Sequence, residues 1–130
     1  MSTNAVTITL AIEARENREV ATCDLIGTYL NADMDVFTIL KLEGYMVDLI
    51  VQVHPDKYSK FIVYKHGEKV LYLKVMKALY GCIKSGFLWY SIFTDTLKNE
   101  RSILDPYDAC VANTVIKGKQ CTIIWYVDDL

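Results

Sequence analysis

The sequence has 130 residues, of which 52% are hydrophobic and 23% are charged, and its formal net charge at pH 7 is −2. This length and composition are typical of a folded domain with a core and exclude an intrinsically disordered chain. The slightly acidic balance argues against a protein that holds nucleic acid by itself, because such a protein carries a broad basic surface.

The sequence contains no candidate membrane span. No run of 18 residues lacks charge, and charged side chains already occur within the first twenty positions, at Glu13, Arg15, Glu16, Arg18 and Glu19. Neither a membrane-spanning helix nor a secretory signal is therefore predicted. The cysteines are far apart and form no zinc pattern with His54 or His66, so reduced, mostly buried thiols and an intracellular location are expected: Cys23, Cys82, Cys110 and Cys121.

The pattern of residues in the N-terminal third of the sequence predicts a helix followed by two strands. In residues 4–17 the apolar residues alternate as in a strand, but Asn4 would cap a helix, and we predict a helix. Residues 19–24 are predicted to form a strand that delivers Asp24 at its end. Residues 36–42 are predicted to form a second strand. No repeat or linker interrupts the chain, so one domain is expected.

The rest of the sequence predicts a hairpin, then a helix, then a second hairpin. Residues 61–64 and 70–75 flank a loop that contains glycine, which indicates a hairpin. Apolar residues recur at helical spacing over residues 85–99, which predicts a helix in which Leu88 and Trp89 serve packing. Strands are predicted at residues 109–116 and 120–127, and the second continues into Asp128-Asp129.

The Asp-Asp pair follows a strongly apolar strand, whereas most such pairs lie in solvated turns. Two adjacent carboxylates at a rigid turn repel one another unless a cation is bound, and a divalent metal removes that penalty. Nucleotidyl transfer commonly uses two metal ions roughly 3.5–4 Å apart. A carboxylate from a second segment is then required, and Asp24 would supply it if the two strands are neighbours.

Three segments resemble motifs of copia-type retrotransposon reverse transcriptases. Tyr126-Val127-Asp128-Asp129 resembles their Y-V-D-D box, and residues 23–33, C-D-L-I-G-T-Y-L-N-A-D, are similar to D-V-x-x-A-F-L-N-G-x-L. Residues 77–90, K-A-L-Y-G-C-I-K-S-G-F-L-W-Y, are similar to K-A-L-Y-G-L-K-Q-S-P-R-x-W-Y. Three motifs in the family's order are more specific than any one of them.

The resemblance implies an α+β fold, a palm-like antiparallel sheet with packed helices that is incomplete. It implies RNA-directed DNA polymerase activity with two Mg²⁺ ions, or Mn²⁺, bound by Asp24, Asp128, Asp129 and the backbone carbonyl of Leu25. The implied partners are an RNA or DNA template with a DNA primer, dNTPs, and the integrase and RNase H of the same polyprotein. The implied location is a cytoplasmic particle or the nucleus.

The resemblance also assigns substrate contacts and shows departures. Tyr29 matches the aromatic position under the incoming sugar, and Tyr126 would lie near the primer end, although either tyrosine could instead be a core residue. Lys84 stands where the family has a glutamine and is kept as a substrate contact. Gly86 and Phe87 replace the family's proline and arginine. Asp33 and Asp35 are interpreted as residues of a turn.

Residues 1–130 are accordingly expected to be a palm fragment that lacks the start of the fingers, the thumb and RNase H, and to be inactive by itself. Two alternatives stay open. The chain could be a catalytically dead remnant or interaction module that keeps palm topology, or an unrelated α/β domain whose acidic residues are surface turns.

Overall fold

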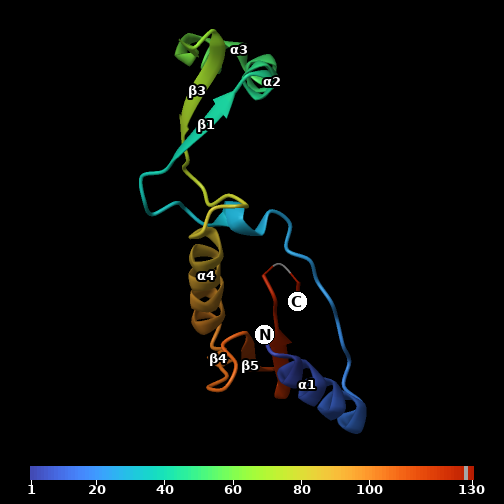
Figure 1. Ribbon diagram of the computed structural model, residues 1–130. Coiled ribbons are helices and arrows are strands. Elements are labelled where there is room, and N and C mark those ends of the chain that lie inside the picture. Colours follow the sequence, from blue (N-terminus) through green and yellow to red (C-terminus); the bar gives the residue numbers. More distant parts are fainter. Residues whose placement is uncertain (128) are drawn as a thin grey trace. The chain divides into compact units, whose positions relative to one another are not determined.

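The computed structural model describes residues 1–127, 129 and 130 and shows a mixed α+β fold with antiparallel sheets, as predicted (Figure 1). Within the region expected to be one domain, the chain divides into two compact units. The first unit contains residues 1–32 and 78–130, and the second contains residues 33–77. Each unit has its own sheet. No helix in the described part of the chain is long and apolar enough to cross a membrane.

The first unit contains α1 (Thr3–Glu16), η1 (Thr28–Asn31), α4 (Ser85–Asn99), β4 (Ile103–Leu104), β5 (Val111–Ile116) and β6 (Lys119–Ile124). The sheet has the antiparallel order β4-β5-β6. β5 and β6 are joined by Lys117-Gly118, whose φ angles of 51° and 78° suit the tight turn of a two-residue hairpin. The helix predicted over residues 85–99 is confirmed with the same bounds.

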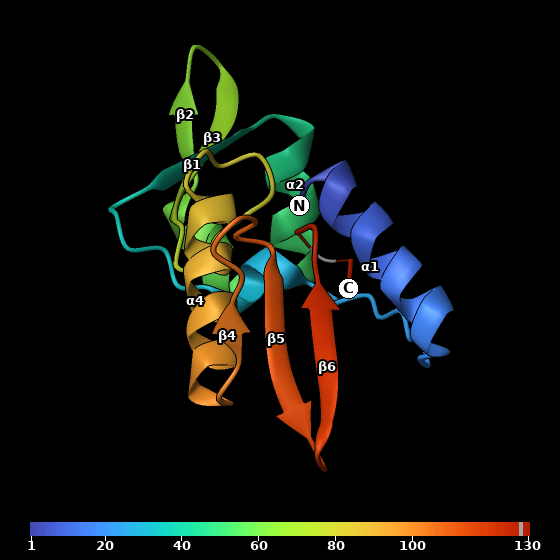
Figure 2. The same ribbon diagram turned by 90° about the horizontal axis from the view of Figure 1, so that it is seen from below.

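α4 packs on one face of this sheet (Figure 2). Leu97 of α4 is buried with Ala112 of β5 and Trp125, which follows β6. Phe93 lies edge-on to Trp125, with ring centroids 5.1 Å apart. Because Phe93 and Leu97 are one helical turn apart, both reach the sheet. Part of the apolar face that predicted the helix therefore forms the core, whereas Ile92 of the same face is exposed.

α1 is confirmed as a helix and lies beside β6 in Figure 2. It lines a hollow with Asn113 and Thr122, which alternate with the Ala112 and Ile123 that face α4, so it is on the opposite side of the sheet. The helix is capped by Ser2, whose hydroxyl accepts a hydrogen bond from the Ala5 N–H at 3.1 Å, and not by Asn4 as predicted. No residue of α1 is buried. The sheet face that lines a hollow with α1 is partly polar, with Asn113 and Thr122 hydrogen-bonded to each other. The apolar residues of α1 occur at every second position, so they do not all lie on one face of the helix. Ile8, Leu10 and Ile12 are therefore exposed.

The second unit contains β1 (Ile39–Glu43), α2 (Tyr45–Val53), α3 (Pro55–Tyr58), η2 (Ser59–Phe61), β2 (Val63–Lys65) and β3 (Glu68–Lys74). The antiparallel order is β1-β3-β2. The predicted hairpin is confirmed, with the turn shortened to His66-Gly67. Its core includes the nearly inaccessible Val47, Val70 and Leu71. Sequence reasoning missed α2, whose N-terminus has no side-chain cap.

Three predicted strands need correction. Residues 19–24 form no strand, and only Asp24 makes an isolated β-bridge. The strand expected at residues 36–42 begins at Ile39. β6 ends at Ile124 and does not reach residue 127, because the backbone turns sharply after Tyr126.

Candidate metal and nucleotide site

Asp24 and Asp129, which were predicted to share a metal site, lie opposite each other in an antiparallel β-bridge. Their neighbours Cys23 and Leu130 exchange both backbone hydrogen bonds, at 3.1 and 2.9 Å. The residue pair beside such a doubly bonded pair is not hydrogen-bonded, and opposing side chains are closest there. The bridge therefore brings the two exposed carboxylates to the same side of the paired backbone.

These two carboxylates border a shallow hollow of about 270 Å³ that is lined by residues 22–24, 129 and 130. Like charges directly opposite in a β-pair are destabilising, and a divalent cation between them would offset that repulsion. Asp128, the third predicted carboxylate, lies outside the described residues. Among the residues that are described, no three His, Cys, Asp or Glu side chains gather to hold a metal. The bridge thus brings together two of the predicted side-chain ligands.

The backbone carbonyl of Leu25, a predicted metal ligand, lies in a turn directly after Asp24. It accepts a hydrogen bond from the hydroxyl of Thr28, which is fully buried at the start of η1. Gly27 makes this turn possible because its φ is 66°, a left-handed conformation that glycine adopts without strain. A carbonyl oxygen has two lone pairs, so Leu25 retains one for a metal.

The turn that carries Asp129 is tight and strained. Tyr126 and Asp129 exchange backbone hydrogen bonds at 2.9 and 3.1 Å. Between them, Val127 has a φ of 59°, a left-handed conformation that a β-branched residue rarely adopts. The indole N–H of Trp89 donates a hydrogen bond of 2.7 Å to the Val127 carbonyl. The turn is therefore attached to α4.

Tyr29 and Tyr126, the two tyrosines predicted to contact substrate, border one aromatic cavity of about 170 Å³. Its other lining residues are Met1, Gly86, Trp89, Tyr90, Cys110, Trp125 and Val127. The side-chain oxygen of Tyr29 would lie 3.9 Å from a Cβ added at Gly86. The structure therefore brings these two residues together, with the departure Gly86 beside them.

Lys84 is not among the lining residues of this cavity. It directly precedes α4 and is half-buried. The neighbouring Ser85 is buried and its hydroxyl donates a hydrogen bond of 2.6 Å to the Leu79 carbonyl, which ties the loop to the start of α4. The substrate contact of Lys84 stays a prediction.

Sequence reasoning missed two aromatic residues at this site. The ring of Tyr80 lies 4.5 Å from that of Tyr29, centroid to centroid. Trp89 does serve packing, because its ring stacks on Phe93 at 5.3 Å, but its bond to Val127 gives it a further contact. Both residues belong to the motif at positions 77–90, so the resemblance could have pointed to them. The sequence of that motif could not show that Tyr80 contacts Tyr29 or that Trp89 contacts Val127.

Asp33 was interpreted as a turn residue, but the structure pairs it with Lys77 instead. Its carboxylate forms an ion pair of 2.7 Å with the ammonium group of Lys77, and the two residues also form an isolated β-bridge. The free thiols predicted for the cysteines are confirmed. However, none of the four is buried, because Cys23 is exposed and Cys82, Cys110 and Cys121 are half-buried, so the expectation of mostly buried thiols was wrong.

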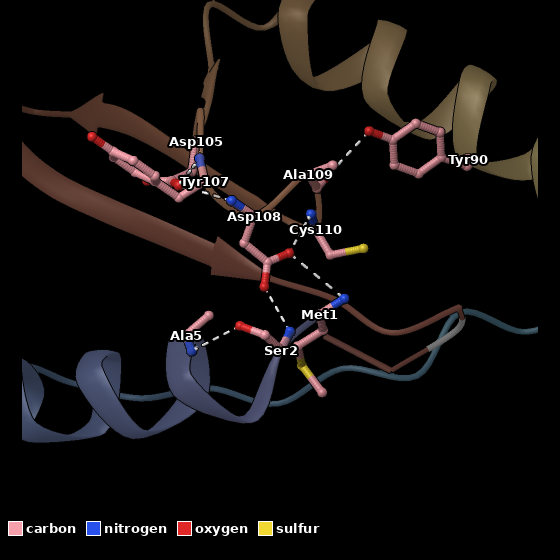
Figure 3. A network of polar contacts seen from close by, with 9 residues as sticks. All are labelled: Met1, Ser2, Ala5, Tyr90, Asp105, Tyr107, Asp108, Ala109 and Cys110. Carbon is pink, nitrogen blue, oxygen red and sulfur yellow. Dashed lines mark hydrogen bonds and ion pairs between the residues drawn. The ribbon is translucent and has the colours of Figure 1, made fainter.

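Asp108, in the loop before β5, lies beside the start of α1 and has a carboxylate with a lowered pKa (Figure 3). Asp108 accepts hydrogen bonds from the backbone N–H groups of Cys110 at 2.9 Å and Ser2 at 2.6 Å. These bonds, the one from Cys110 above all, lower the pKa of Asp108 from 3.8 to about 2. Asp108 therefore anchors α1 and has no evident part in the site at Asp24.

No protein-family model, curated protein or solved structure matches the chain. The functional assignment therefore depends on the three motifs and on the geometry of the residues that they name.

Proposed function

We propose that the chain is the palm part of a copia-type reverse transcriptase, an RNA-directed DNA polymerase that uses two Mg²⁺ ions, with Mn²⁺ as a substitute. The observation that carries the proposal is the β-bridge between Asp24 and Asp129. These residues come from the first and last of the three motifs and are far apart in the sequence. If both aspartates were only surface turn residues, nothing would require them to lie opposite each other.

In this proposal, Asp24 and Asp129 hold the metal ions together with Asp128 and the carbonyl of Leu25. The bound ions would activate the attacking oxygen and stabilise the leaving group. Tyr29 supports the sugar of the incoming dNTP, and its own ring is supported by Tyr80.

The remaining substrate contacts follow from the aromatic cavity and the start of α4. The face of Tyr126 packs near the primer end. Lys84 contributes a positive charge to the nucleotide. The proposed partners are an RNA or DNA template with its DNA primer, and the integrase and RNase H of the same polyprotein. The proposed location is intracellular, in a cytoplasmic particle or in the nucleus.

One observation favours the alternative of a non-catalytic interaction module. Ile83 is fully exposed and Phe87 is 65% exposed, at positions where the family motif has lysine and arginine. Two exposed apolar side chains at basic positions would suit a protein partner better than a phosphate backbone. Metal binding separates the two functions.

The metal site is tested by titrating the chain with Mn²⁺ and measuring free Mn²⁺ by electron paramagnetic resonance. We expect Asp24→Asn and Asp129→Asn each to weaken Mn²⁺ binding by about 10- to 100-fold, because each removes a charged ligand. The control is Asp56→Asn, which removes an exposed carboxylate of the second unit and should bind as the unmodified chain does. Equal affinities for all four proteins, or no Mn²⁺ binding at all, would favour the interaction module.

Polymerase activity is tested by primer extension on an RNA template in Mg²⁺. The 130-residue chain is assayed beside a longer chain that also contains the fingers and thumb that the resemblance implies. The longer chain should extend the primer, and Asp24→Asn should reduce its rate by roughly 100-fold or more. Extension that survives Asp24→Asn would contradict the proposed role of this carboxylate.

A further inference from the structure

We propose that Trp89 is a positioning residue, whose indole N–H holds the Val127 carbonyl and so keeps Asp129 opposite Asp24. The relevance of this role to catalysis rests on the function proposed above. The role itself is a property of the turn and is measurable without metal. The proposal is argued from three observations. Val127 has a strained backbone, the indole of Trp89 is held rigidly, and Asp129 is paired with both Tyr126 and Asp24.

Val127 does not adopt its conformation by preference. Its φ of 59° lies in the left-handed region, where the β-branched side chain of valine crowds the backbone. Such a conformation persists only where the surrounding structure enforces it. The hydrogen bonds between Tyr126 and Asp129 close the turn, and the bond of 2.7 Å from Trp89 fixes the carbonyl between them.

The donor is held rigidly. Trp89 lies on α4, is only 7% exposed, and stacks on Phe93, which in turn packs edge-on against the buried Trp125. A buried indole N–H requires an acceptor, since an unpaired polar group in the interior is costly. The Val127 carbonyl is that acceptor. The aromatic cluster of α4 therefore determines where this carbonyl points.

Asp129 transmits this restraint to the bridge. It closes the turn through its backbone bonds to Tyr126, and it is also the bridge partner of Asp24. The next residue, Leu130, is hydrogen-bonded to Cys23. If the peptide after Val127 rotates, both sets of bonds lose their alignment, because only two peptide bonds separate Val127 from Asp129.

The test compares Trp89→Phe, which keeps an aromatic ring but removes the donor, with Phe93→Leu, which disturbs the same cluster but keeps the donor. Amide hydrogen exchange is measured by NMR without metal. Trp89→Phe should speed exchange at Asp129 and Leu130 by about tenfold relative to amides of β5, as expected for the loss of one restraining hydrogen bond. Phe93→Leu should speed exchange at all these amides together.

A second substitution separates positioning from general destabilisation. Val127→Gly removes the strain, because glycine adopts a positive φ freely. Added to Trp89→Phe, it should restore slow exchange at Asp129 and Leu130. A uniform loss of protection in Trp89→Phe, or no recovery in the double variant, would overturn the proposal.

Mn²⁺ affinity then links the turn to the metal site. The same Trp89→Phe protein should bind Mn²⁺ several-fold more weakly than the unmodified chain. If the unmodified chain binds no Mn²⁺, the proposed function fails, while the exchange data still decide the role of Trp89. If both proteins bind Mn²⁺ equally, Trp89 does not position the site.

Discussion

Asp108 shows how one carboxylate can hold the start of a helix. Its side chain is only 13% exposed, and it accepts the backbone N–H of Ser2 at the N-terminus of α1 (Figure 3). A negative charge is favourable there because the first N–H groups of a helix have no partner within the helix. The bond from the Cys110 N–H joins the same carboxylate to the loop before β5.

This anchoring predicts a dependence of stability on pH. The pKa of Asp108 is about 2 in the folded chain and 3.8 for an unperturbed aspartate, so the carboxylate stabilises the fold above about pH 4. Its contribution is lost as the pH falls from 4 to 2. Asp108→Asn should lower the free energy of unfolding at pH 6 by about 1–2 kcal/mol and should cost little at pH 2. Urea denaturation followed by circular dichroism measures both values.

A matched control for Asp108 is Asp95→Asn, which changes an exposed carboxylate on α4 that pairs with Lys98 at 3.5 Å. Exposed pairs of this kind contribute little to stability, so this variant should unfold like the unmodified chain at both pH values. The same pH profile for Asp108→Asn and the unmodified chain would contradict the anchor.

At the scale of elements, the first turn of α4 contains a glycine that lowers the stability of the helix. Gly86 is its second residue, and a Cβ added there would meet only the Tyr29 side-chain oxygen, at an ordinary distance of 3.9 Å. Glycine within a helix costs conformational entropy on folding. Gly86→Ala should therefore raise the free energy of unfolding by about 0.5–1 kcal/mol.

In the hairpin between β5 and β6, replacing a glycine with alanine should instead be destabilising. A Cβ added at Gly118 would meet no atom within 4 Å, but the residue has a φ of 78°, which alanine adopts only with strain. Gly118→Ala should lower the free energy of unfolding by about 1 kcal/mol or more. Thermal denaturation of both variants checks the pair of predictions. A stabilising Gly118→Ala would mean that the turn does not keep its left-handed conformation in solution.

At the scale of the whole molecule, the chain has two cores with different reporters. Trp89 and Trp125 both lie in the first unit, so tryptophan fluorescence reports on that unit. Leu71, which is fully buried, belongs to the core of the second unit. Leu71→Ala should destabilise the second unit by about 2–4 kcal/mol, through lost burial and the cavity that remains.

Hydrogen exchange at the amides of β3 measures that loss directly, and tryptophan fluorescence during urea unfolding is recorded on the same variant. We expect the exchange of β3 amides to change more than the fluorescence midpoint, because the altered core contains neither tryptophan. An equal shift in both measurements would show that the two units unfold as one cooperative structure.

Local patterns in the sequence predicted several elements well. The helix over residues 85–99 was predicted with its bounds, because its apolar residues recur at helical spacing and face one sheet. Glycine placed both hairpin turns, since each requires a positive φ. The strand expected at residues 19–24 failed because its pairing depends on a distant segment, where only Cys23 and Asp24 find partners, Leu130 and Asp129.

The candidate site divides in the same way. The sequence by itself determined which carboxylates and tyrosines to consider, because the motifs depend on residue type and order. Only the tertiary structure decided that Asp24 pairs with Asp129, that Tyr29 and Tyr126 share a cavity with Gly86, and that Trp89 holds Val127. The physical reason is that these contacts join segments far apart in the chain. Their geometry depends on how α4 packs against the sheet, which no local pattern of residues specifies.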